Sequence, residues 1–200
     1  MNQKQTSKKS QSIDEALINA TSADTKGYII MRELPTDEYF EETSNAIKKL
    51  TEQGYEGVYL SFQRPFSNIS DSFQNKGIDM DKMLVIDAAS ALCCAEDIKV
   101  SDPHCVPIEQ KTNVDELVKA IYSSLPKLHG KKHFVFIDSL TTITLYKPLS
   151  ETIRFSDFLV KTVRKSEDIE LTLIFNVSKD LSQKDFIRDV AFKVDEVVAA

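Results

Sequence analysis

The stretch that decides the fold is KHFVFID, residues 132–138, in which four consecutive apolar residues are followed by a single acid. A short, continuous apolar run rich in aromatic and β-branched residues is typical of a strand that is buried on both faces of a sheet. Such strands occur in parallel sheets that helices cover on both sides. The segment therefore predicts an α/β protein.

The rest of the chain repeats this pattern on either side, because apolar runs alternate with segments of helical periodicity. We expect further strands at residues 27–32, 57–62, 83–87, 171–177 and 194–199. We expect helices at residues 37–53, 66–76, 114–125, 153–165 and 183–190, and a short helix that begins at Ser12. Gly54 and Gly77 are expected to end the first two of these helices. Residues 88–112 show no clear period and are predicted to form a loop. The order predicts a doubly wound, mostly parallel sheet with helices on both faces.

Length and composition favour one globular domain. The 200 residues are 42% hydrophobic and 28% charged, and we expect a flexible tail at residues 1–11 followed by a single domain at residues 12–200. A net charge of −6 argues against broad nucleic-acid binding, which needs a positive surface. The sequence has no apolar run of about 20 residues for a membrane span, and its polar start is unlike a secretory signal. We therefore expect a cytoplasmic protein.

The three cysteines do not indicate a disulfide framework, because their number is odd. Cys93, Cys94 and Cys105 lie close to His104, and these residue types can bind zinc. Structural zinc sites usually place two ligands two to four residues apart, which adjacent cysteines do not match. We expect partly buried thiols and no bound metal.

Three segments resemble the RecA/KaiC-like ATPases, in particular archaeal KaiC-like proteins. HFVFIDSLTTI at residues 133–143 resembles a Walker B strand, whose final acid holds the magnesium ion of a nucleotide. Residues 58–90 are similar to the KaiC-type stretch in which a strand and a helix are followed by Gly-Ile-Asp and a second strand that ends in Asp. Residues 138–164 are similar to the segment in which Asp-Ser-Leu precedes a helix bearing Arg-Phe. The resemblance covers most of the chain, from about Gly27 to Ala199.

The resemblance implies a nucleotide- or metal-binding role for Asp138 and the adjacent Ser139. A structural interpretation is also open, in which Asp138 only caps the turn that follows the strand.

Two catalytic elements of the family are missing. Residues 32–39 (RELPTDEY) stand where the family has its P-loop, and they contain no glycine to wrap phosphates and no lysine to neutralise them. The resemblance also implies a catalytic Glu pair after the second strand, where this sequence has Gln63 and Arg64. An amide and a guanidinium are not general bases at neutral pH. We therefore expect no ATP hydrolysis, no catalytic residues and no bound cofactor.

We expect a non-catalytic domain that acts through contacts with a protein partner or with itself, in the regulatory or signalling setting that the resemblance implies. The alternative is a protein that binds a nucleotide or another small molecule near Asp138 in an altered mode. Leu145 and Tyr146 follow the Walker B-like strand, and they are the candidate interface residues. For these two side chains, packing into the core is the competing interpretation.

Overall fold

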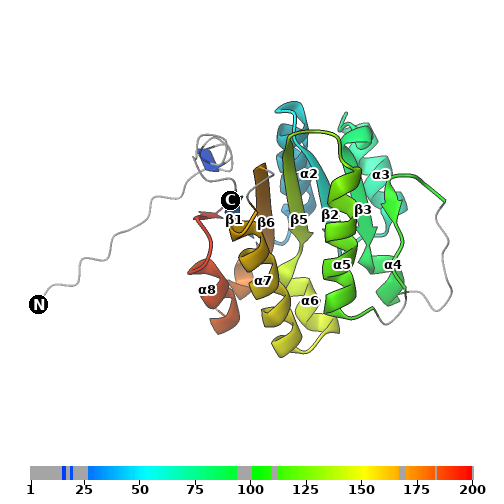
Figure 1. The fold of residues 1–200 in the computed structure, drawn as a ribbon. Coiled ribbons are helices and arrows are strands. Elements are labelled where there is room, and N and C mark those ends of the chain that lie inside the picture. The colour runs from blue at the N-terminus through cyan, green and yellow to red at the C-terminus, as the bar shows by residue number, and fades with distance from the viewer. Residues whose placement is uncertain are drawn as a thin grey trace, which may run out of the picture.

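The centre of the molecule is a seven-stranded sheet (Figure 1). The computed structural model describes residues 15, 16, 19, 27–93, 101–109, 112–166, 170–182 and 184–199. The strands are β1 Gly27–Leu34, β2 Glu56–Ser61, β3 Met83–Asp87, β4 Cys105–Val106, β5 Lys132–Asp138, β6 Glu170–Ser178 and β7 Glu196–Ala199. They are arranged in the order β4-β3-β2-β5-β6-β1-β7, and every neighbouring pair is parallel. The expected doubly wound α/β fold is confirmed.

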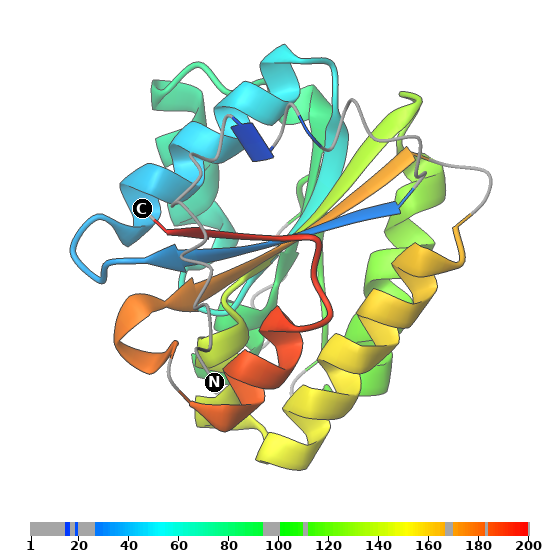
Figure 2. The same ribbon diagram turned by 90° about the vertical axis from the view of Figure 1, so that its left-hand side faces the viewer.

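Helices cover both faces of this sheet, as the two perpendicular views show (Figures 1 and 2). One face carries α2 Tyr39–Glu52 and α3 Phe66–Asn75. The other carries α5 Val114–Ser124, α6 Leu140–Tyr146, α7 Leu149–Arg164 and α8 Asp185–Ala191. A short helix, α4 Ala88–Cys93, follows β3 directly.

The central strands are apolar throughout because successive side chains enter two different cores. On β5, Phe134 and Phe136 belong to the cluster beneath α2 and α3. Val135 and Ile137 belong to the cluster beneath α5, α6 and α7. No described helix combines the length and the apolar character that a membrane-spanning segment needs.

Local signals in the sequence explain where several helices begin and end. Asn113 and Glu116 form a capping box at the start of α5, in which each side chain accepts a hydrogen bond from the other residue's backbone N–H. Gly54 and Gly77 follow α2 and α3 with φ angles of 83° and 69°, a left-handed conformation that glycine adopts without strain. Both glycines end a helix as the sequence predicts.

The sequence-based boundaries are wrong in two places. Residues 88–112 include the helix α4 and the two-residue strand β4 rather than a loop alone. Residues 140–146 form α6, and α7 begins at Leu149 instead of at residue 153. The α6 sequence LTTITLY is rich in β-branched residues with low helix propensity, so pattern alone does not identify it.

The N-terminal predictions fall largely on residues that are not described. Of the helix expected from Ser12, the described residues Glu15, Ala16 and Asn19 are helical. Ser12 itself, and the tail at residues 1–11, lie outside the described part of the chain.

Candidate site at the carboxyl edge of the sheet

A line of polar residues crosses five neighbouring strands near their carboxyl ends. Arg32 of β1 lies in register with Asn176 of β6, and Ser61 of β2 lies in register with both Asp138 of β5 and Asp87 of β3. The β5–β6 register, in which Ile137 is opposite Phe175, extends this line from Asp138 to Asn176. We call Arg32, Asn176, Asp138, Ser61 and Asp87 the polar row. All five are buried beneath the face that α2 and α3 cover.

Asp138 lies in the middle of the polar row and is 1% exposed. One carboxylate oxygen accepts a hydrogen bond from the Tyr59 hydroxyl. The other accepts one from the Asn176 amide at 3.4 Å. Both donors are side chains of neighbouring strands, so the acid is held by the sheet itself.

Asn176 connects Asp138 to Arg32. Its amide nitrogen also donates to the Thr43 hydroxyl at 2.8 Å, and its amide oxygen accepts from the Arg32 guanidinium at 3.3 Å. Arg32 is buried as well, and it donates to the backbone carbonyl of Glu42 at 3.1 Å and lies 3.8 Å from the Glu42 carboxylate. Arg32 is therefore directed into the protein, toward α2.

The electrostatics of this network are balanced within the chain. Burial raises the pKa of Asp138, while the hydrogen bond from Tyr59, the nearby Tyr39 hydroxyl, the hydrogen bond from Asn176 and the positive charge of Arg32 oppose that rise. Burial lowers the pKa of Arg32 to about 10, so that this side chain still carries its charge at neutral pH. The negative charge of Asp138 is therefore balanced by the positive charge of Arg32.

Two tyrosines, Tyr39 of α2 and Tyr59 of β2, also lie beside Asp138. Burial, together with the nearby Asp138, holds the pKa of both Tyr39 and Tyr59 well above the usual range of a phenol. The Tyr39 hydroxyl is close enough to influence Asp138, but it is buried without a well-formed hydrogen bond.

Tyr39 also forms part of the wall of a surface pocket with a volume of about 170 Å³. This pocket lies at the carboxyl edge of the sheet, between the turn after β1 and helix α6. Thr36, Gln63 and Thr142 are among its other lining residues. Tyr39 therefore lies against both the pocket and the buried acid.

Ser139, the second predicted binding residue, forms hydrogen bonds with its neighbours. Its hydroxyl accepts a hydrogen bond from the Thr142 backbone N–H at 3.1 Å and so caps α6. The Gln63 amide lies 3.4 Å from the same hydroxyl and 3.0 Å from that of Thr142. The structural interpretation of Asp138 as the cap is therefore wrong in detail, because the cap is the residue that follows it. The peptide bond between these two residues is cis.

The candidate interface residues are at the surface. Leu145 is 77% exposed and Tyr146 is 40% exposed, so the competing assignment of these side chains to the core is wrong. Leu149, the first residue of α7, is also exposed, at 50%.

The structure describes only part of the segment that contains the three cysteines and His104. Cys94 and the side chain of Cys93 lie outside the described residues. Cys105 is buried and its pKa is raised to about 11, mainly by that burial. His104 lies 3.6 Å from Asp81. Across the described residues, no three side chains of the metal-binding types come together.

Sequence reasoning located Asp138 but missed the residues that hold it. Arg32, Tyr59 and Asn176 belong to strands that are far apart in the sequence and meet only through sheet register. The available signal was a polar residue within or at the end of an apolar strand, as Asn176 is in LTLIFNV. A buried polar side chain needs a partner, and this rule would have flagged it.

Comparison with known proteins supports the fold. The sequence matches no protein-family model and no curated protein. The structure is similar to that of the uncharacterized protein PH0321 from Pyrococcus horikoshii in complex with an unknown peptide, with a TM-score of 0.66 at 12% identity over 95% of this chain and 84% of that chain. It is also similar to the KaiC-like protein PH0186 from Pyrococcus horikoshii, with a TM-score of 0.56 at 15% identity over 88% of this chain and 71% of that chain. The chain therefore has a RecA/KaiC-like α/β core.

Proposed function

We propose that this chain is a non-catalytic RecA/KaiC-like domain of the cytoplasm that acts by binding a protein or peptide, in a regulatory or signalling role. The observation that carries the proposal is the state of Asp138. The acid that would hold a magnesium ion is buried, hydrogen-bonded to Tyr59 and Asn176, and faced by the charge of Arg32. A metal would have to displace these partners before it could bind.

The turn after β1 supports the same conclusion. A phosphate cradle needs several backbone N–H groups and a cation that face the ligand. Here the first cation of the segment, Arg32, donates instead to Asn176 and to the Glu42 backbone. The exposed residues that follow include Asp37 and Glu38, whose charge disfavours a triphosphate.

The residues after β2 also lack a base. The Gln63 amide donates to Thr142, and the Arg64 guanidinium lies 4.1 Å from the centre of the Phe40 ring. Neither group can accept a proton from an attacking water.

Binding to another polypeptide is favoured by the exposed apolar residues at this edge of the sheet. Leu145, Tyr146 and Leu149 lie within five positions of one another, and exposed apolar residues that gather in this way often mark interaction surfaces. The similar protein PH0321 was crystallised in complex with a peptide, which is consistent with this assignment.

A calorimetric titration with ATP and with ADP, each with magnesium, tests the absence of nucleotide chemistry. We expect no binding heat and no hydrolysis above background. Binding that requires magnesium and disappears in Asp138→Asn would contradict the proposal and favour the alternative, an altered nucleotide site. A turnover of about 1 per second or faster, typical of working enzymes, would have the same consequence.

The contact surface has its own test, in which Tyr146→Glu is compared with Phe192→Glu. Phe192 is 83% exposed and directly follows α8, at a distance in sequence from α6. We expect Tyr146→Glu to weaken association with a recovered partner or with a second copy and to leave the circular dichroism spectrum unchanged. An equal loss in both variants would assign the effect to added charge rather than to this surface.

A further inference from the structure

Several polar groups that line the pocket beside Tyr39 already have hydrogen-bond partners within the protein. The Thr36 hydroxyl donates to Asp180 at 3.2 Å, and the Gln63 amide donates to Thr142 at 3.0 Å. The Thr141 hydroxyl accepts from the Ser178 backbone N–H at 3.3 Å. Because these donors and acceptors are engaged, a polar ligand would gain little by entering.

None of the described residues that line the pocket is positively charged, and most of the surface that they expose there is apolar. This composition disfavours an anion such as a phosphate or a carboxylate, whose desolvation would not be compensated. It favours an aliphatic or aromatic group.

Two exposed leucines form part of the wall. Leu145 of α6 is 77% exposed, and Leu181, in the short turn of helix after β6, is 37% exposed. A side chain placed between them would remove apolar surface of both leucines from water, which favours binding. An apolar side chain bound in the pocket would therefore cover the exposed surface of these two leucines.

One side of the pocket is acidic. Asp37 and Glu38 are exposed and stand between the lining residues Thr36 and Tyr39 in the sequence. Asp180 precedes Leu181 and is held beside the pocket by its hydrogen bond from Thr36. Lys179 also lies on this side, and its charge acts on the nearby Glu33. The three exposed acids would attract a cation next to the group in the pocket.

We propose that this pocket binds a peptide segment in which an apolar side chain is adjacent to a lysine or an arginine. The apolar side chain lies between Leu145 and Leu181, and the basic side chain faces Asp37, Glu38 and Asp180. This inference rests on the proposed function, because it specifies the chemistry of the partner that the non-catalytic domain would bind.

Selection from a phage-displayed library of random heptapeptides on the full-length chain tests the proposal. We expect the enriched sequences to pair an apolar residue with a neighbouring lysine or arginine. A synthetic, fluorescently labelled copy of the most enriched peptide then serves as the probe for anisotropy titrations. Leu145→Asp should raise the dissociation constant at least tenfold. Asp180→Asn should raise it a few-fold, and the difference from wild type should shrink at high salt.

Two matched variants control for general surface effects. Phe192→Asp alters an exposed apolar residue that does not line the pocket, and Asp71→Asn removes an exposed acid on α3. Both should leave the dissociation constant within twofold of wild type.

Several outcomes would overturn the inference. They are the failure of any sequence to be enriched, enrichment of acidic sequences, and binding that Leu145→Asp does not weaken. A dimer in light scattering that Leu145→Asp dissociates would assign the surface to a second copy of the chain and would also overturn it. None of these results depends on the magnesium–nucleotide titration, so that failure of this inference and failure of the proposed function can be told apart.

Discussion

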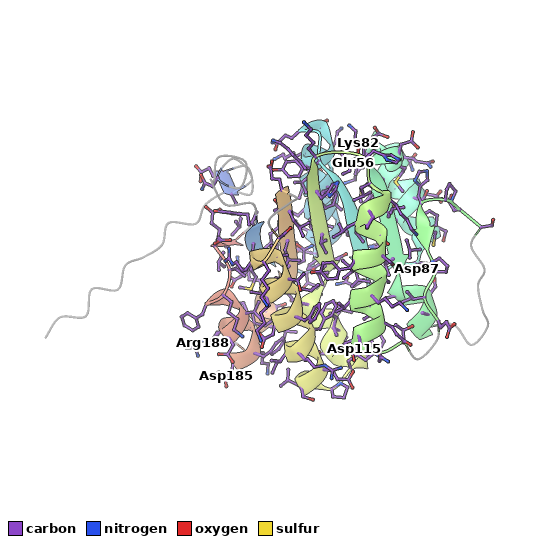
Figure 3. The ribbon with its side chains drawn as sticks, viewed as in Figure 1. Glu56, Lys82, Asp87, Asp115, Asp185 and Arg188 are labelled. Atoms are coloured by element: carbon purple, nitrogen blue, oxygen red, sulfur yellow. The ribbon has the colours of Figure 1, made fainter. Side chains whose placement is uncertain are left out.

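Strands β3 and β5 both end in the dipeptide Ile-Asp, yet the two acids accept hydrogen bonds from different kinds of donor. Both lie in register with Ser61 of the strand between them. Asp87, labelled in Figure 3, accepts hydrogen bonds from the Phe66 backbone N–H at 2.8 Å, at the start of α3. It also accepts from the backbone and the hydroxyl of Ser90 in α4, at 2.8 and 2.7 Å. Asp138 instead accepts from side chains of neighbouring strands.

The residue after each acid explains this difference. Asp87 is followed by Ala88, which has no side-chain acceptor, so the acid itself caps the helix that follows. Asp138 is followed by Ser139, whose hydroxyl caps α6. Once that capping need is met, Asp138 is available to the polar row. An apolar strand that ends in an acid therefore does not identify a metal ligand unless the donors around it are known.

The largest expected effect is that of Asp138→Ala, which should lower the free energy of unfolding by about 3 kcal/mol. The substitution leaves the Tyr59 hydroxyl, the Asn176 amide and the Arg32 charge without their buried partner. Urea unfolding followed by circular dichroism measures the change. Asp138→Asn is the control, and it should lose less because it keeps an acceptor and adds no cavity. A loss below about 1 kcal/mol in the alanine variant would show that the network contributes little.

The corresponding substitution on β3, Asp87→Ala, should cost about 2 kcal/mol because it removes the acceptor shared by the starts of α3 and α4. The same unfolding measurement applies. Asp87→Asn retains an acceptor and should recover about half of the loss. If alanine and asparagine were equally destabilising, the charge at this position would matter more than the capping hydrogen bonds.

The features of this site that depend on local sequence patterns could be predicted, whereas those that depend on contacts between distant parts of the sequence could not. The strand at residues 132–138, its final acid and the glycines that end α2 and α3 depend on local patterns, and all were predicted. The partners of Asp138 depend on sheet register, which brings Arg32 beside Asn176 across 144 positions. No local pattern encodes that pairing. The exposure of Leu145 was also open, because an apolar residue after a strand can fold back or face solvent.

Smaller effects on stability are expected from substitutions of the residues that follow the two acids, Ser139 and Ala88. Ser139→Ala removes the cap of α6 and should lower the free energy of unfolding by about 1 kcal/mol, while Ser139→Thr, which keeps the hydroxyl, should lose less. Ala88→Ser offers α4 a second acceptor that it does not need, since Asp87 already fills that role. Because Ala88 is 1% exposed, the added hydroxyl would be buried, and the substitution should lower the free energy of unfolding by about 1 kcal/mol. A large gain in stability from Ala88→Ser would show that Asp87 is a poor cap.

The smallest expected effect is a pH dependence that belongs to Asp138. Burial raises its pKa in the folded protein above the ordinary value of the unfolded chain. Between those two values the folded state binds more protons at this site, so that stability falls as pH rises through this window. The free energy of unfolding of the wild type, relative to Asp138→Asn, should therefore increase when the pH is lowered through the same window.

This comparison isolates Asp138 because other titrating groups are common to both proteins. Burial lowers the pKa of His133, at the opposite end of β5, so its contribution to stability is lost as pH falls below the ordinary value of a histidine. That loss affects the wild type and Asp138→Asn equally, and it cancels in the difference between them. Unfolding curves at several pH values between 4 and 7 measure the difference. A constant difference would mean that Arg32 and the hydrogen-bond donors offset the burial of Asp138 completely. An opposite slope, with the wild type relatively less stable at low pH, would show that they outweigh it.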